Sequence, residues 1–184
     1  AEMGPVITRS SLQRIEEWIA DAEAAGARVV LDGRGYRPEG EEFADGFWLG
    51  PTILDEVDRG LQVYREEVFG PVLVVVRADT YEEAIAIVNS SEFGNGSAIF
   101  TSDGDTARHF TVDVEAGMVG VNVPIPVPVA YYSFGGWKES LLGDTHIHGP
   151  EGVRFYTRAK VVTSRWPKRG EKVGYVGMNF PTNG

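Results

Sequence analysis

The chain has 184 residues, an ordinary apolar fraction of 42%, a net charge of −10 and no cysteine. Its length suffices for one domain with its own core, while no apolar run approaches the ~20 residues that cross a bilayer. The acidic balance argues against nucleic acid as a partner, and the absence of cysteine excludes disulfides and thiolate metal sites. Together with the lack of a charged-then-apolar leader, these properties predict a cytoplasmic protein.

Hydrophobic periodicity predicts a series of helices and strands along the chain. We expect helices over residues 10–25, 80–88 and 103–114, and strands over residues 28–31, 47–54, 72–77, 97–100, 118–123 and 153–165. From residue 72 onward, strands and helices alternate at the spacing of parallel strands that are joined by right-handed crossovers. The sequence therefore predicts an α/β fold, in which helices flank a parallel sheet and one further strand ends the chain.

Residue types at the ends of these elements sharpen the prediction. Ser10 with Gln13 fits a capping box at the start of the first helix, and Gly26 fits its end. Pro51 cannot donate to a ladder, so we expect the second strand to lie at an edge of the sheet. The near-continuous apolar run over residues 72–77 instead predicts a strand that is buried on both faces.

The last part of the chain combines alternation with positive charge. Residues 153–165 alternate and are β-branched near their end, which is typical of a long strand. Residues 154–172 hold seven basic residues and one acid, which suits either docking on an acidic neighbour such as another subunit or protection of an exposed strand edge. We therefore divide the chain into a compact part, residues 1–152, and a strand arm with a flexible tail, residues 153–184, and we expect a homo-oligomer.

Two side chains stand beside a sharp turn that leads into the apolar run. Glu67 and Phe69 belong to the sequence Glu-Glu-Val-Phe-Gly-Pro, in which Gly70 tolerates unusual dihedrals and Pro71 fixes its own. This geometry would hold both side chains at the mouth of a sheet. A carboxylate can accept two hydroxyl protons of a ribose, and an aromatic ring can hold a nicotinamide face. Single Glu and Phe residues are common on surfaces and in cores, but this context favours contact with a cofactor.

A proline-rich loop follows the strand predicted to end at residue 123. Prolines at positions 124, 126 and 128 keep the loop extended. A rigid apolar lip of this kind, at the carboxyl end of a parallel strand, suits the wall of a substrate pocket. The loop continues to Ser-Phe-Gly-Gly, where Phe134 taken alone would be a core residue of a structural loop.

Several motifs, taken in order, resemble those of the aldehyde dehydrogenase superfamily. They are GPVIT from residue 4, EEVFGP from residue 66, EAGMVGVNVPIPVPVAYYSFGGWK from residue 115 and GDTHIHGPEGVRFYTRAKVVTSRWP from residue 143. The proline loop and GDTHIHGPEG resemble the coenzyme-A-acylating branch, the methylmalonate-semialdehyde dehydrogenases. The resemblance runs from Met3 to about Pro167 and matches the later part of the family's chain, so the sequence is interpreted as a C-terminal fragment.

The resemblance implies an NAD-dependent oxidation of a semialdehyde to an acyl-coenzyme A, with a place in valine catabolism. In the family a cysteine thiolate attacks the aldehyde, a hydride passes to NAD, and in this branch the acyl group goes to coenzyme A. That cysteine lies upstream in the family, so we assign no catalytic residue here and expect the chain alone to be inactive. Glu67 and Phe69 carry over as contacts on the nicotinamide side of NAD, Asn122 and Phe134 as pocket residues, and residues 155–166 as a strand that joins a neighbouring subunit's sheet.

Two other functions stay open, namely a hydrolytic aldehyde or semialdehyde dehydrogenase of another branch and a non-catalytic oligomerisation module. One departure favours the acylating branch, because Ile147 stands where many hydrolytic relatives have a glutamate that could help to activate water. His146 and His148 invite a metal site, but no nearby acid or cysteine completes it, so we predict no metal. The expected partners are a small semialdehyde and coenzyme A, with neither nucleic acid nor a membrane.

Overall fold

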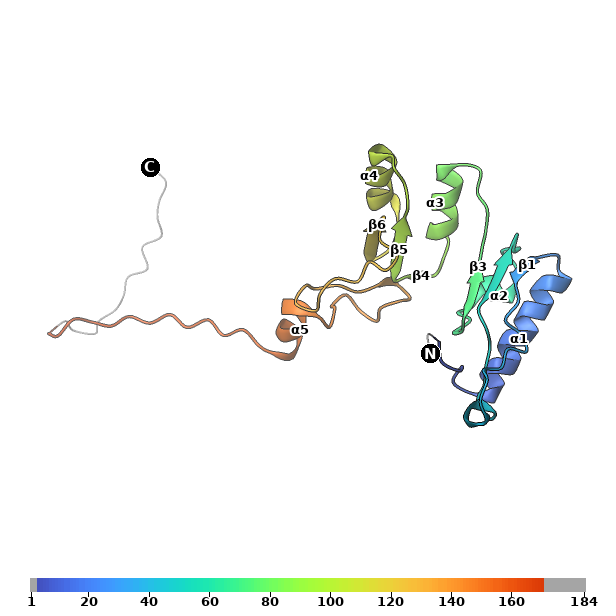
Figure 1. The fold of residues 1–184 in the computed structure, drawn as a ribbon. Helices are drawn as coiled ribbons and strands as arrows, with labels where there is room; N and C mark the ends of the chain where they lie inside the picture. Colours follow the sequence, from blue (N-terminus) through green and yellow to red (C-terminus); the bar gives the residue numbers. More distant parts are fainter. Residues whose placement is uncertain (1–2, 171–184) are drawn as a thin grey trace. The chain divides into compact units, whose positions relative to one another are not determined.

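The computed structural model of the protein describes residues 3–170, which divide between two compact units, Ala1–Ser91 and Glu92–Gly184 (Figure 1). The first unit holds α1 (Arg9–Ala24), β1 (Arg28–Leu31), the short 3-10 helix η1 (Glu41–Phe43), β2 (Thr52–Asp55), α2 (Gln62–Arg65), β3 (Val72–Val74) and α3 (Tyr81–Asn89). The second unit holds β4 (Phe93–Gly94), β5 (Gly96–Ile99), α4 (Gly104–Asp113), β6 (Met118–Val121), β7 (Trp137–Lys138) and α5 (Gly149–Tyr156). This order confirms the predicted α/β class.

The first helix has a different N-cap from the one that the sequence predicts. Thr8 has the extended backbone of an N-cap, and its hydroxyl oxygen accepts a hydrogen bond from the backbone N–H of Ser11 at 3.0 Å. The capping box predicted at Ser10 is therefore wrong, because Ser10 already lies inside the helix. The predicted helix end is confirmed at Gly26, whose φ of 105° is a conformation that favours glycine.

The strands of the first unit form a mixed sheet in the order β1-β2-β3. β1 pairs antiparallel with β2, with Arg28 opposite Asp55, and β2 pairs in parallel with β3, with Leu54 opposite Val74. The edge position predicted for β2 is wrong. Pro51 precedes the strand instead of interrupting it, so every residue of β2 keeps its backbone donor.

α1 runs along one face of this sheet and supplies much of the core of the first unit (Figure 1). Ile15 and Ile19 are fully buried in one cluster with Leu54 of β2, and the first and last residues of β3 pack against that cluster. Leu73 lies between those two residues and is 58% exposed. The predicted burial of residues 72–77 on both faces is therefore wrong for this structure, because side chains alternate along β3 and α1 covers one face.

The second unit contains the parallel pair that the sequence predicts. β5 and β6 pair in parallel, beginning with Gly96 opposite Met118, and α4 connects them. Asp103 caps α4, because its carboxylate accepts a hydrogen bond from the backbone N–H of Thr106 at 2.6 Å. The antiparallel pair β4–β7 was not predicted, since two residues per strand are too few to show a period.

The strand predicted over residues 153–165 is wrong in its first part, which forms the end of α5. Pro150 in the first turn suits a helix start. Glu151 lies in the first turn and Arg154 in the last, so the charge of each complements the partial charge at its end of the helix. Residues 157–168 are in neither a helix nor a ladder. A ladder needs a hydrogen-bonded partner, so the pairing of this segment with another subunit stays a prediction.

Part of the predicted tail lies outside the described residues. Within the described part of the chain, no helix combines the length and the apolar content that crossing a membrane requires.

Where the sequence predicts one parallel sheet, the structure has two separate parallel pairs, β2–β3 and β5–β6. It also has the antiparallel pairs β1–β2 and β4–β7.

Candidate functional site

Glu67 and Phe69 lie in the α2–β3 loop, residues 66–71, of the first unit. Both side chains are exposed, Phe69 by 69%. Phe69 also has a φ of 54°, a left-handed conformation that costs a non-glycine residue about 1–2 kcal/mol. The loop therefore presents a carboxylate and an aromatic ring to its surroundings from a strained backbone.

The unusual backbone of this loop falls on a different residue from the one that the sequence indicates. Gly70 was expected to supply the unusual dihedral, yet the positive φ belongs to Phe69. Gly70 is needed for another reason, because a Cβ at this position would stand 2.7 Å from Cδ1 of Ile15 in α1. Pro71 then leads into the sheet, where its carbonyl accepts from the backbone N–H of Thr52 at 2.9 Å. The sharp entry into the sheet is confirmed, with close packing rather than torsional freedom as the role of the glycine.

Asn122 follows β6 and ties two strand ends together. Its side-chain oxygen accepts from the backbone N–H of Thr101 at 2.9 Å, and its side-chain nitrogen donates to the carbonyl of the same residue at 3.0 Å. Its backbone N–H donates to Ile99 at 2.8 Å, and its φ is 57°. The amide thus closes the gap between the chains that leave β5 and β6. These bonds hold the end of β6, beside which the proline loop begins.

Phe134 lies in the second unit and stacks on His148. The two ring centres are 4.4 Å apart and the ring planes differ by 3°, with both side chains half-buried. Two motifs that are fourteen residues apart in the sequence, Ser-Phe-Gly-Gly and the histidine-containing segment before α5, therefore pack together. Sequence reasoning missed His148 as the partner of Phe134, although both lie in segments that carry the family resemblance.

A polar cluster joins the same two segments. The hydroxyl of Ser133 donates to the carboxylate of Glu151, and Nδ1 of His146 lies 3.7 Å from the same carboxylate oxygen and 3.5 Å from the Ser133 hydroxyl. The hydrogen bond from Ser133, followed by contacts with His146, lowers the pKa of Glu151. A serine–histidine–acid relay needs the serine and the acid on opposite ring nitrogens, whereas here both approach Nδ1. The cluster is suited to holding the segments together.

The two histidines of the GDTHIHGPEG segment do not share a face. His146 lies beside Glu151, while His148 lies on the ring of Phe134. Within residues 3–170, no three His, Cys, Asp or Glu side chains gather in a way that could hold a metal ion.

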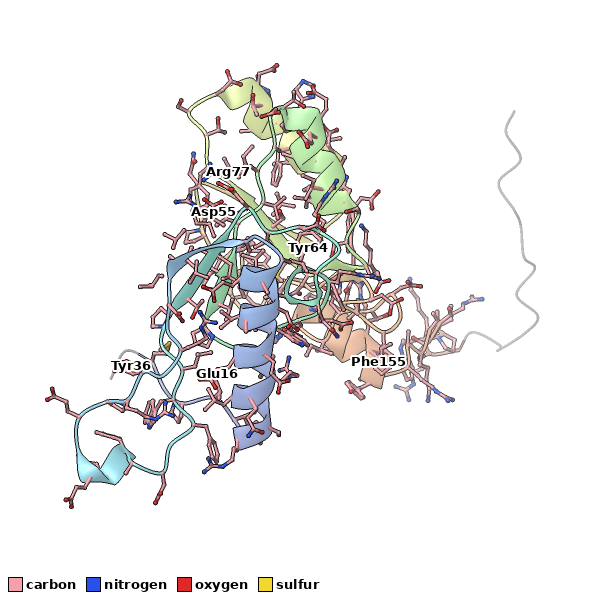
Figure 2. The ribbon with its side chains drawn as sticks, turned by 90° about the vertical axis from the view of Figure 1, so that its right-hand side faces the viewer. Glu16, Tyr36, Asp55, Tyr64, Arg77 and Phe155 are labelled. Carbon is pink, nitrogen blue, oxygen red and sulfur yellow. The ribbon has the colours of Figure 1, made fainter. Side chains whose placement is uncertain are left out.

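A buried charged site of the first unit was not predicted. Asp55 is buried at the end of β2, and Arg28 and Arg77 both donate to its carboxylate, the latter at 2.6 Å. Figure 2 shows Asp55 and Arg77 side by side. Arg77 and then Arg28 lower the pKa of Asp55 to about 2. One aspartate at the end of an apolar run gives little signal in a sequence, because its partners lie 22 and 27 residues away.

The sequence matches a family model described as the aldehyde dehydrogenase family over residues 1–162. A malonate-semialdehyde dehydrogenase of Pseudomonas aeruginosa is 54% identical over 168 residues, which are 91% of this chain and 33% of that protein. A mitochondrial acylating methylmalonate-semialdehyde/malonate-semialdehyde dehydrogenase of Bos taurus is 44% identical over 184 residues, which are 100% of this chain and 34% of that protein.

Solved structures give the same result. The crystal structure of a methylmalonate-semialdehyde dehydrogenase from Oceanimonas doudoroffii superposes with a TM-score of 0.81 and 50% identity, over 90% of this chain and 34% of that chain. A Mycobacterium tuberculosis aldehyde dehydrogenase complexed with NAD+ superposes with a TM-score of 0.72 and 36% identity, over 85% of this chain and 31% of that chain. The chain spans about a third of the length of these proteins. The resemblance inferred from the motifs is confirmed, and the chain belongs to the aldehyde dehydrogenase family.

Proposed function

We propose that this chain is the C-terminal part of an NAD-dependent, coenzyme-A-acylating malonate- or methylmalonate-semialdehyde dehydrogenase. The observation that carries the proposal is the difference in identity between branches of the family. Identity is 50% and 54% with two semialdehyde dehydrogenases, and 36% with the Mycobacterium tuberculosis enzyme. The proposed reaction is oxidation of the semialdehyde to an acyl-coenzyme A.

The α2–β3 loop fits the role of an NAD contact. Glu67 and Phe69 are both exposed in one short loop, so neither needs to leave a core to reach a ligand. NAD, when bound, supplies the acceptor for the hydride of the aldehyde. The carboxylate of Glu67 would accept hydrogen bonds from ribose hydroxyls, and the ring of Phe69 would pack against the nicotinamide.

The residues of the second unit fit a supporting role at a substrate pocket. Phe134 presents an apolar face that is held by His148, and Asn122 fixes the start of the proline loop. The chain has no cysteine, so it does not supply the nucleophile of a thiolate reaction. We propose that the 184 residues alone do not reduce NAD with an aldehyde.

We also propose that the parent enzyme is a cytoplasmic homo-oligomer, with residues 1–152 as part of a catalytic domain and residues 153–184 as an arm. Phe155 and the apolar residues after it are exposed (Figure 2). Residues 157–168 lie in neither a helix nor a ladder, and a segment of this kind can add to the sheet of another subunit. Light scattering at high concentration would test this arrangement, and a clean monomer would count against it.

Assay of the enzyme that carries this chain would test the proposed function. Malonate semialdehyde and methylmalonate semialdehyde should each yield NADH and an acyl-coenzyme A, at a rate that depends on coenzyme A. Free acid formed at the full rate without coenzyme A would favour a hydrolytic enzyme of another branch. No oxidation of any aldehyde would favour the oligomerisation module.

Replacing Glu67 would test its place in the cofactor site. In the parent enzyme, Glu67→Gln should raise the KM for NAD and slow turnover, with a smaller change in the KM for the semialdehyde. Glu66→Gln is a matched control, because Glu66 is the preceding exposed carboxylate in the same loop. Unchanged NAD kinetics in Glu67→Gln would remove this residue from the site.

A further inference from the structure

The α2–β3 loop has one side toward the core and one side toward its surroundings. Val68 packs against the core cluster of the first unit, and a Cβ on Gly70 would stand 2.7 Å from Cδ1 of Ile15 in α1. Glu67 and Phe69, which alternate with them, are exposed. The position of the two exposed side chains therefore depends on how the loop rests on α1.

Arg14 of α1 makes a polar contact with this loop. Its Nη2 atom donates a hydrogen bond to the carbonyl oxygen of Val68 at 3.0 Å, in a partly buried setting. Its guanidinium carbon lies 4.4 Å from the ring centre of Trp18, one turn further along the same helix. Stacking on an indole restricts the rotamers of an arginine and orients its planar fork. The ring of Trp18 thus helps to hold the donor that meets Val68.

The contact acts on the strained part of the loop. The carbonyl of Val68 belongs to the peptide group that joins Val68 to Phe69, so turning this group changes φ of Phe69. That angle is 54°, and a non-glycine residue leaves the left-handed region when nothing holds it there. A charged donor on the carbonyl fixes the orientation of the peptide group.

We infer that Arg14 is a positioning residue for the cofactor contact, which sets the α2–β3 loop so that Glu67 and Phe69 face the ligand. Arg14 does not touch the ligand. It acts through the carbonyl of Val68. The inference rests on the proposed function for the identity of the ligand, NAD, and on the geometry of the first unit for the role of Arg14.

Hydrogen exchange of the 184-residue chain tests the positioning step without any activity. Arg14→Met removes the donor and keeps an unbranched stem over Trp18. Arg9→Met is the matched control, because Arg9 lies on the same helix with its guanidinium 5.3 Å from the ring of Phe47, and its loss changes the charge equally. The backbone amides of Val72 and Thr52 donate to the carbonyls of Gly70 and Pro71 in this loop, at 2.8 and 2.9 Å. These two amides should exchange faster in Arg14→Met than in Arg9→Met, while protection within α1 is equal in both.

Kinetics of the parent enzyme test the consequence for the cofactor. Loss of a hydrogen bond from a charged donor should raise the KM for NAD roughly tenfold in Arg14→Met, with kcat and the KM for the semialdehyde changed less than about twofold. Arg14→Lys keeps a cation near the carbonyl and should fall between the wild type and Arg14→Met. If Arg14→Met loses protection throughout α1, Arg14→Lys decides the question by the same two measurements.

The outcomes separate this inference from the proposed function. Equal exchange of the loop in the Arg14 and Arg9 variants would overturn the positioning role, whatever the enzyme does. A loosened loop with an unchanged KM for NAD would overturn the link to the cofactor. A wild-type enzyme that does not use NAD would overturn the proposed function, while the exchange measurement still shows whether Arg14 sets the loop.

Discussion

Among the described residues, the first unit of this chain buries more of its apolar side chains than the second unit does. In the first unit α1 closes over the β1-β2-β3 sheet, and Ile15, Ile19 and Leu54 are fully buried. In the second unit the buried apolar residues are Phe110, Val114, Ala116 and Met118. Exposed apolar residues of the second unit include Ile125, Val127, Val129, Tyr131, Tyr132, Leu142, Ile147, Val153, Phe155 and Tyr156.

This difference in burial between the units limits what can be concluded from an apolar pattern in a sequence. Such a pattern marks the residues that are buried in a complete protein, and it does not say which segment buries them. For the first unit the covering helix lies within the 184 residues. For the second unit, the cover would come from other parts of the proposed parent enzyme or from another subunit.

The largest expected effect comes from the core of the first unit. Ile19→Ala should destabilise that unit by about 2–5 kcal/mol, because it deletes a fully buried side chain and leaves a cavity. The matched substitution in the second unit, Val112→Ala, removes a side chain that is 83% exposed and should stay within about 0.5 kcal/mol. Urea unfolding followed by hydrogen exchange in each unit would measure both. Equal costs would contradict the difference in burial between Ile19 and Val112.

The second unit should instead be sensitive where its backbone segments meet. A Cβ on Gly117 would stand 1.9 Å from the carbonyl oxygen of Gly135, so Gly117→Ala should cost about 1–3 kcal/mol by pushing two backbones apart. Gly104→Ala is the control, since a Cβ added there would lie 3.6 Å from an atom of the flexible Arg108 side chain. Loss of protection around Phe134 in the first variant alone is the expected result. Equal protection in both variants would mean that the loops do not meet as described.

Acid should weaken the first unit through one buried carboxylate. The arginines lower the pKa of Asp55 from 3.8 to about 2 in the folded chain, so the unfolded chain takes up the proton first. The stability that Asp55 contributes is therefore present above about pH 4 and is lost as the pH falls toward 2. In urea unfolding between pH 5 and pH 2.5, Asp55→Asn should show a smaller loss of stability than the wild type.

A control for this measurement is Asp45→Asn, which changes the charge equally at an exposed carboxylate of the same unit. This variant should keep the wild-type dependence on pH. If Asp55→Asn also keeps the wild-type dependence on pH, protonation of Asp55 does not account for the loss of stability in acid.

Local signals in the sequence predicted much of this fold. β1 was predicted with its bounds, and Gly26 ended α1 as expected. The helices α1, α3 and α4 and the strands β5 and β6 were predicted to within a few residues. The failures have a common cause in three-dimensional context. Pro51 was read as part of a strand that it only precedes, and the alternation after residue 153 belongs to a helix up to Tyr156.

The candidate site was predictable to a similar degree and for similar reasons. Motif order led to Glu67 and Phe69, which the structure exposes together. Arg14 was beyond sequence reasoning, because its contact with Val68 bridges 54 residues and involves a backbone carbonyl that any residue type could supply. The same holds for the stacking of Phe134 on His148, which depends on the path of two loops.

The smallest expected effect tests whether the outer face of the β1-β2-β3 sheet is free in this chain. Leu73→Thr should change the stability of the 184 residues by less than about 0.5 kcal/mol, since Leu73 is 58% exposed and threonine suits a strand. Val74→Thr, one residue along and facing α1, places a hydroxyl against the core and should cost about 1–3 kcal/mol. A cost above about 1 kcal/mol for Leu73→Thr would mean that this chain already covers the face. In the parent enzyme the same substitution should become costly, because the proposed remainder of the protein would then bury Leu73.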